Sequence, residues 1–297
     1  MSATRESDRK PTTESTGKST TGATSGIGAR LRRWAAKDYV WLAAFLVACT
    51  GLYFSGNLSA ETAFRIPPPA VDLKDVAPAS SAAGASGPAV DKAAGGGATI
   101  AKAAAADGQQ TMVIAGGCFW GVQAVFQHTK GVIQAVSGYA GGKADTANYQ
   151  RVTADDTGHA ESVQVTFDPA QVSYGELLHI FFSVVHDPTQ LNRQGPDVGH
   201  HYRSAIFFAD EAQKQVAQQY IAQLDAAKVY RTRIVTELTP LQGFYPAEAY
   251  HQDYATNFPH SPYIIAFDLP KIENLRTMFP ERYRREPQLV GAKRAGA

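Results

Sequence analysis

The chain has 297 residues, of which 28 are Lys or Arg and 27 are Asp or Glu, so its formal net charge is +1. A charge this close to zero excludes the strong electrostatic field by which nucleic-acid-binding proteins attract their ligand, and we expect no nucleic-acid partner. Two cysteines, Cys49 and Cys118, are too few for a disulfide framework, and the sequence has no CxxC spacing that would indicate a zinc or dithiol centre.

The N-terminal part of the chain divides into two segments of different composition. Residues 1–29 consist largely of Ser, Thr and Gly with almost no large apolar side chains, so we expect a disordered tail. Residues 30–60 contain a basic flank and then an uncharged apolar run over 39–54, a pattern typical of a signal sequence or signal anchor. We therefore expect a membrane contact through residues 39–54, with the remainder of the chain in the cell envelope, on the periplasmic side of the inner membrane.

Three fates of the apolar run stay open. The run can remain as an uncleaved anchor, or it can be removed by cleavage after a small residue such as Ala60. Alternatively, the sequence Leu-Val-Ala-Cys resembles a lipoprotein box, in which Cys49 would be the lipid attachment point. Each of the three places the following residues outside the inner membrane.

A Pro-, Ala- and Gly-rich stretch over residues 61–109 predicts a flexible linker, residues 110–285 predict a single catalytic domain, and residues 286–297 predict a disordered tail. Apolar runs predict strands over residues 112–115, 132–139 and 204–209, and alternation of apolar and polar residues predicts strands over 160–167 and 233–238. Helical patterns predict helices over residues 119–126, 174–185, 211–226, 247–256 and 271–278. The loops vary too much for a regular parallel repeat. We therefore predict an α+β fold, a two-layer sandwich with helices packed on a mixed, largely antiparallel sheet.

Cys118 lies in the segment Gly-Gly-Cys-Phe-Trp-Gly over residues 116–121, where a predicted strand gives way to a predicted helix. A thiol at the start of a helix meets free N–H groups and the positive end of the helix dipole, which favour the thiolate. Cys118 is therefore a candidate nucleophile. The alternative, a small buried apolar side chain, is common for a free cysteine and stays open on position alone.

Glu161 stands at the start of the strand predicted over residues 160–167. Alternation places it on the same face as Val163 and Val165, which we expect to be the buried face. Burial raises the pKa of a carboxyl group, so Glu161 could stay protonated near neutral pH and donate a proton. A carboxylate in a surface salt bridge is the alternative.

Further polar residues cluster in loops. His186-Asp187-Pro188 and the segment from Asp197 to Arg203 contain several His and Asp side chains, but none has the helical spacing of a metal motif, so no metal is predicted. A polar pocket wall that includes Asp197 and Tyr202 is the favoured interpretation. The cluster over residues 249–254 is interpreted as packing or surface residues.

Six motifs together resemble those of the A-type peptide methionine sulfoxide reductases, over about residues 112–283. They are GGCFWG at 116–121, GYAGG at 138–142, TGHAE at 157–161, HDP at 186–188, DVGHHYRS at 197–204 and AYHQDY at 249–254. The resemblance implies an oxidoreductase that reduces the S epimer of methionine sulfoxide, free or in proteins, to methionine. It also implies a role in repairing proteins after oxidative stress.

The resemblance assigns a role to each site residue. Cys118 would attack the sulfoxide sulfur, Glu161 would donate a proton to its oxygen, Tyr149 and Tyr202 would bind this oxygen, and Asp197 would support them. The implied substrate-binding residues are Phe119 and Trp120, which would receive the S-methyl group, together with Gly117 and His159. Attack would leave Cys118 as a sulfenic acid.

The chain departs from many of these relatives because it has no cysteine after Cys118 that could resolve the sulfenic acid internally. We therefore expect a single-cysteine form without a cofactor, recycled by an external thiol of the thioredoxin-like, glutaredoxin or glutathione type, and acting as a monomer. Two alternatives remain. One is a Cys-His-Asp hydrolase with His159 or His186 as base, and the other is a non-enzymatic binding module of the envelope.

Overall fold

The computed structural model describes residues 63–76 and 108–290. The predicted N-terminal tail, the apolar run over 39–54, most of the predicted linker and the end of the C-terminal tail lie outside the described residues. Within the described residues, no helix combines the length and the apolar character that crossing a membrane requires.

A six-stranded sheet with the order β7-β6-β1-β3-β2-β8 forms the centre of the domain. Its strands are β1 (Gln110–Gly116), β2 (Val132–Ala140), β3 (Ala160–Phe167), β6 (Ser204–Phe208), β7 (Glu237–Pro240) and β8 (Phe244–Pro246). Neighbouring strands are antiparallel except for β6 and β7, which are parallel. The predicted mixed, largely antiparallel sheet of an α+β fold is confirmed.

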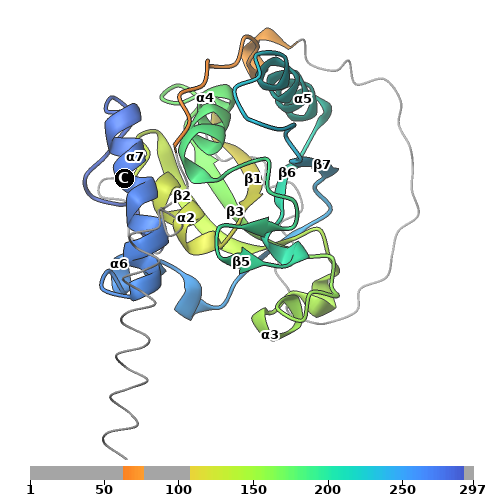
Figure 1. Cartoon of the computed structure of the whole chain (residues 1–297), viewed down its shortest axis with the longest axis vertical. Coiled ribbons are helices and arrows are strands. Elements are labelled where there is room, and N and C mark those ends of the chain that lie inside the picture. The colour runs from red at the N-terminus through yellow and green to blue at the C-terminus, as the bar shows by residue number, and fades with distance from the viewer. Residues whose placement is uncertain (1–62, 77–107, 291–297) are drawn as a thin grey trace, which may run out of the picture. The chain divides into compact units, whose positions relative to one another are not determined.

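Helices pack on this sheet, as Figure 1 shows. The α-helices are α2 (Phe119–Gln127), α3 (Tyr149–Val152), α4 (Tyr174–Ile180), α5 (Glu211–Ala226), α6 (Tyr254–Asn257) and α7 (Leu269–Met278). Single π-helical turns, η4 (Phe181–Val185) and η7 (Ile264–Asp268), extend α4 and precede α7. Short 3-10 turns cover η1 (Leu73–Asp75), η3 (Ala144–Thr146), η5 (His200–Tyr202) and η6 (Ala249–His251), and a small hairpin joins β4 (Arg193–Gln194) to β5 (Asp197–Val198).

Strand β3 lies between β1 and β2 and carries the main core. Its alternating residues Val163, Val165 and Phe167 are fully buried and belong to the same hydrophobic cluster as Phe126 of α2. An eight-residue strand with an apolar side chain at every second position can bury one face against helices in this way. The core thus holds the two ends of β3 in fixed positions, including the end that carries Glu161.

Two predicted elements differ from the observed ones. The strand predicted over residues 233–238 is instead Glu237–Pro240, and the helix predicted over residues 247–256 is split into η6 and α6. The split occurs because Asp253 has a left-handed backbone with φ 58°. Tertiary bonds hold it there, since Gln123 Oε1 accepts from the Asp253 N–H and Gln127 Nε2 donates to its carboxylate.

Residues 63–76, which the composition assigned to the linker, instead pack on the domain as an ordered strap. The Phe64 N–H donates to the Ser183 carbonyl at 2.8 Å, the Tyr220 hydroxyl donates to the Pro67 carbonyl at 2.8 Å, and Asp72 accepts from the Gly175 N–H at 3.0 Å. In Figure 1 the strap is the orange segment beside α4 and α5. The linker prediction is therefore wrong for these residues, because three successive prolines hold an extended backbone whose carbonyls are free to accept hydrogen bonds.

Replacement of Ile66 by serine is expected to lower the free energy of unfolding by about 2–3 kcal/mol, because Ile66 is the buried apolar side chain of the strap. Thermal and urea unfolding of the intact chain would measure the change. Arg65→Ser is the matched control, since the neighbouring Arg65 is exposed. Equal unfolding curves for the two variants would show that the strap does not dock in solution.

Candidate active site

Cys118 is held at the junction of β1 and α2, where it is the residue that precedes the helix. Gly117 before it has φ 87°, and a Cβ atom there would lie 2.6 Å from the Cβ of Gln194. Only glycine fits this position, because both the backbone conformation and the space exclude a side chain. The chain therefore reaches Cys118 through a tight turn that presses against the β4–β5 hairpin.

Glu161 is the second residue of β3 and enters the site from the start of this strand. The Phe119 N–H, at the start of α2, donates to Glu161 Oε2 at 3.0 Å. Burial, with smaller contributions from the charges of Asp197 and Asp268, raises the pKa of Glu161 to about 8, although the bond from Phe119 opposes this shift. Glu161 is thus a buried, protonated carboxylic acid at neutral pH, as the strand alternation predicted.

The thiol of Cys118 does not behave as its place at a helix start predicts. Burial, and next the charge of Glu161, raise the pKa of Cys118 well above its ordinary value, while the hydrogen bond from the Trp120 N–H lowers it by less. This raised pKa opposes the prediction that the helix start favours the thiolate. The free-energy cost of desolvating a thiolate is larger than the stabilisation that the helix N-terminus gives it. Cys118 and Glu161 are therefore a thiol and a carboxylic acid in the resting site.

Tyr149 and Tyr202 bring two phenol groups toward the same place. Tyr149 opens α3, and its N–H donates to Glu248 Oε1 at 2.9 Å, while Tyr202 ends the 3-10 turn η5. Burial raises the pKa of both phenols, and the charges of Glu161 and Cys118 contribute next in both cases. Both hydroxyls therefore stay protonated and can donate hydrogen bonds.

Phe119 and Trp120, the first residues of α2, have different surroundings. The Phe119 ring is buried and lies 5.9 Å from Tyr139 and 5.0 Å from His251. Trp120 is only partly buried, stacks on Tyr254 at 3.7 Å and donates from Nε1 to His251 Nδ1 at 3.2 Å. The cluster over residues 249–254, which the sequence did not connect with the site, therefore fixes the orientation of Trp120.

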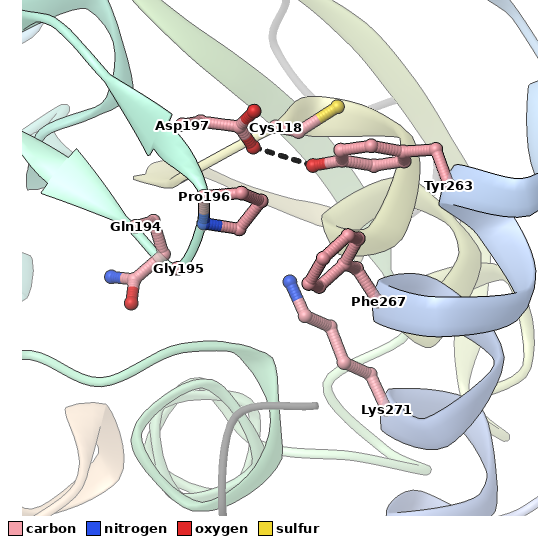
Figure 2. A pocket seen from close by; sticks show the side chains of 8 residues that line it. All are labelled: Cys118, Gln194, Gly195, Pro196, Asp197, Tyr263, Phe267 and Lys271. Carbon is pink, nitrogen blue, oxygen red and sulfur yellow. Dashed lines mark hydrogen bonds between the residues drawn. The ribbon is translucent and has the colours of Figure 1, made fainter. Parts of the chain in front are cut away.

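Asp197 lies near Cys118 and Glu161, since its charge acts on both groups, and its Oδ2 accepts a hydrogen bond from the Tyr263 hydroxyl at 2.5 Å. Figure 2 shows both groups beside the Cys118 sulfur, at the edge of a cavity of about 20 Å³. The cavity is lined by Cys118, Gln194, Gly195, Pro196, Asp197, Tyr263, Phe267 and Lys271. Sequence patterns did not single out Tyr263, Phe267 or Lys271, because their one-turn spacing is also that of ordinary helix packing.

His159 does not join this group. Its ring is buried, Gly142 N–H donates to its Nδ1 at 3.2 Å, and its Nε2 pairs with the Lys143 carbonyl at 2.9 Å. The ring therefore braces the loop after β2, and the structure does not support substrate binding by His159. His186 likewise uses both nitrogens, on Ser204 Oγ at 2.7 Å and the Phe181 carbonyl at 3.2 Å.

These bonds also bear on the hydrolase alternative. Burial lowers the pKa of His186 to about 3. With its two nitrogens bonded to other groups, His186 cannot serve Cys118 as a base, and the same holds for His159. Among the residues that the structure describes, no group of His, Cys, Asp and Glu side chains could hold a metal ion.

The fold and the site together define a thiol-dependent enzyme in which one cysteine acts beside a neutral carboxylic acid and phenol donors. Residues 110–283 match the family "Peptide methionine sulfoxide reductase". The chain belongs to this family and is an oxidoreductase of methionine sulfoxide.

Individual proteins that resemble this chain include two curated relatives and one solved structure. "Peptide methionine sulfoxide reductase MsrA 2" of Mesorhizobium japonicum is 58% identical over 186 residues, which is 63% of this chain and 95% of the relative. A protein of the same name from Synechocystis is 51% identical over 179 residues, 60% of this chain and 84% of the relative. The solved structure "Methionine sulfoxide reductase A of Corynebacterium diphtheriae" is 35% identical with a TM-score of 0.46, covering 54% of this chain and 80% of that one.

Proposed function

We propose that the protein reduces the S epimer of methionine sulfoxide, free or in proteins, with Cys118 as nucleophile and Glu161 as proton donor. The observation that carries the proposal is the neutral carboxyl group of Glu161. It accepts a hydrogen bond at 3.0 Å from the N–H of Phe119, the residue that follows Cys118, and so lies near the thiol. A sulfoxide sulfur becomes electrophilic when its oxygen is protonated or strongly hydrogen-bonded. A nucleophile and an acid must therefore meet at one sulfoxide group.

The reaction needs no further chemical group. Glu161, Tyr149 and Tyr202 donate hydrogen bonds to the sulfoxide oxygen, and the Cys118 sulfur attacks the sulfoxide sulfur. The Glu161 proton goes to the oxygen, the Cys118 proton returns to the Glu161 carboxylate, and the substrate S–O bond breaks as the oxygen passes to Cys118. The products are methionine and a Cys118 sulfenic acid, so that the sulfoxide is reduced by two electrons and the cysteine is oxidised by two.

The remaining predicted residues shape the substrate position. Phe119 and Trp120 present apolar rings to the S-methyl group, and Gly117 brings the backbone close to it. Asp197 orients the polar side of the site through its bond from Tyr263. A site that combines two phenols with two apolar rings is chiral, which supports selection of one sulfoxide epimer.

We further propose that an external thiol of the thioredoxin-like, glutaredoxin or glutathione type recycles Cys118, and that no cofactor takes part. The sequence supports this step, because it has no cysteine after Cys118 and Cys49 belongs to the apolar segment. Membrane attachment through residues 39–54, a position in the cell envelope and a monomeric state remain proposals. The first two rest on the basic flank and apolar run of residues 30–60.

The full chain, purified in detergent, tests these proposals with peptides that carry stereopure methionine sulfoxide. Without a thiol we expect about one methionine per protein from the S epimer, and mass spectrometry should find one added oxygen on Cys118. With dithiothreitol, turnover should continue. Absence of methionine from the S epimer would overturn the activity, and a Cys49–Cys118 disulfide after one turnover would overturn recycling by an external thiol.

A further inference from the structure

The exposed large apolar side chains of the domain gather around the reactive site. Within the residues that the structure describes, six such side chains are exposed, with exposed fractions between 38% and 68%. They are Leu191, Val198, Tyr250, Phe258, Ile265 and Leu269, and we call them the apolar rim. Single exposed apolar side chains scattered over a surface are ordinary, but a group confined to one region indicates a binding surface.

Two of the three segments that carry the apolar rim also line the cavity beside Cys118. Val198 belongs to the β4–β5 hairpin, which lines this cavity, and Leu191 lies in the loop just before β4. Ile265 lies in η7 and Leu269 is the first residue of α7, and other residues of the same helical segment line the cavity. These four rim residues are therefore placed next to the reactive sulfur by the elements that hold the site.

The third segment carries Tyr250 and Phe258. The Tyr250 ring lies 4.3 Å from His251, which accepts the hydrogen bond from Trp120 Nε1. The Phe258 ring lies 4.6 Å from Tyr254, which stacks on Trp120 at 3.7 Å. Ring contacts thus connect both rim residues to the first turn of α2, and α2 itself contacts α6, η7 and α7 (Figure 1).

Much of the rim surface carries no charge. Residues 254–267, which include Phe258 and Ile265, contain no Asp, Glu, Lys or Arg. Helix α5, by comparison, carries Glu211, Lys214 and Asp225. An uncharged surface can be covered by an apolar partner without burying an ionised group, which would cost free energy.

A polypeptide substrate has to cover this surface. When its methionine sulfoxide reaches Cys118, the neighbouring residues of the same extended chain run away from the site by about 3.3 Å each. The residues just before and after the sulfoxide therefore lie over the segments that surround Cys118, and these segments carry the apolar rim. Free methionine sulfoxide has no such neighbours and leaves the rim exposed to water.

We propose that the apolar rim binds apolar residues that flank methionine sulfoxide in an extended polypeptide, and so directs the protein to sulfoxides in apolar, unfolded segments. The inference rests on the proposed function and names the class of its substrate. Apolar segments are buried in folded proteins, so the preferred substrates are oxidised proteins that have lost their fold. Removal of apolar surface from water supplies the binding free energy.

Single-turnover release of methionine without thiol tests the proposal on the full chain in lipid nanodiscs. The probes are two S-sulfoxide peptides of equal length and charge. One has leucine and valine at the three positions on each side of the sulfoxide, and the other has serine and glutamine there. At subsaturating peptide we expect a rate ~10-fold higher for the apolar peptide, and at saturation we expect equal rates, because the rim acts on binding and not on the chemical step.

Val198→Ser and Ile265→Ser should each lower this preference ~3-fold, and the double variant should lower it to near one. The rate with the polar peptide should stay unchanged in all three. Gln218→Ser, on the exposed side of α5, is the matched control and should keep the full preference. Partition of the apolar peptide into the lipid is the same for every variant and cannot cause these differences.

Equal subsaturating rates with the two peptides would overturn the proposal, as would a full preference in the double variant. If that full preference accompanies slower steady-state recycling by a thioredoxin, the rim binds the reductant instead. If it accompanies a change of oligomeric state, measured by sedimentation, the rim joins two copies of the chain. Absence of methionine from both peptides would overturn the proposed function, and the inference with it.

Discussion

Replacement of Cys118 by serine is expected to abolish methionine release, with a loss of ~10⁵-fold or more in kcat/KM. A serine hydroxyl is a far weaker nucleophile and cannot hold the transferred oxygen as a sulfenic acid. Chromatographic measurement of methionine from an S-sulfoxide peptide, with dithiothreitol present, would give the loss.

Cys49→Ser is the matched control for this variant, because Cys49 is the other cysteine of the chain and should be dispensable for turnover. Retention of more than a small fraction of activity in Cys118→Ser would contradict Cys118 as the nucleophile. A loss of activity in Cys49→Ser would contradict recycling by an external thiol alone.

Glu161→Gln should reduce kcat by ~10²- to 10⁴-fold, because the amide keeps the shape but supplies no acidic proton. In the unsubstituted protein the proton is present below the pKa of Glu161, about 8, so turnover should decline as the pH rises through this value. The decline should be absent from the residual activity of Glu161→Gln. Initial rates across pH 6 to 9.5 would measure both, with roughly constant ionic strength to limit screening effects.

Glu161→Gln should make Cys118 more reactive toward alkylation, although it slows turnover. The charge of Glu161 raises the pKa of the Cys118 thiol, so removing it should lower that pKa. Above pH 8 iodoacetamide should therefore alkylate Cys118 faster in Glu161→Gln than in the unsubstituted protein, while turnover is slower. Slower alkylation together with slower turnover would indicate a misfolded site instead of a missing acid.

The free energy of unfolding should also depend on pH through the raised pKa of Glu161. A carboxyl group whose folded pKa is raised binds its proton more tightly in the folded state, so its contribution to stability is lost as the pH rises from the unfolded pKa to the folded one. For Glu161 this window runs from about 4.5 to about 8. Glu161→Gln should therefore unfold at a higher temperature than the unsubstituted protein above pH 8, and a lower temperature there would contradict burial of this carboxyl.

Much of the fold was predictable from local patterns. The alternation over residues 160–167 identified β3 and its buried face, and with it the burial of Glu161. The helix predicted over residues 174–185 begins where α4 does, and Ser173 and Glu176 form a capping box at this start. Sequence patterns failed at Asp253, because tertiary hydrogen bonds hold its backbone in a left-handed conformation that ends the predicted helix. They also failed for the strap, because its proline-rich segment packs on the domain and does not act as a free linker.

The sequence by itself determined the reactive pair, because Gly-Gly-Cys-Phe-Trp-Gly and Thr-Gly-His-Ala-Glu carry their chemistry in single residues, Cys118 and Glu161. Only the tertiary structure decided the protonation of that pair, since the desolvation that raises both pKa values depends on what surrounds them. It also decided that Lys271 and Asp197, which are far apart along the chain, line one cavity with Cys118. Local periodicity cannot predict this proximity. It indicates on which face of a helix or strand a side chain lies, but not which distant residue that side chain contacts.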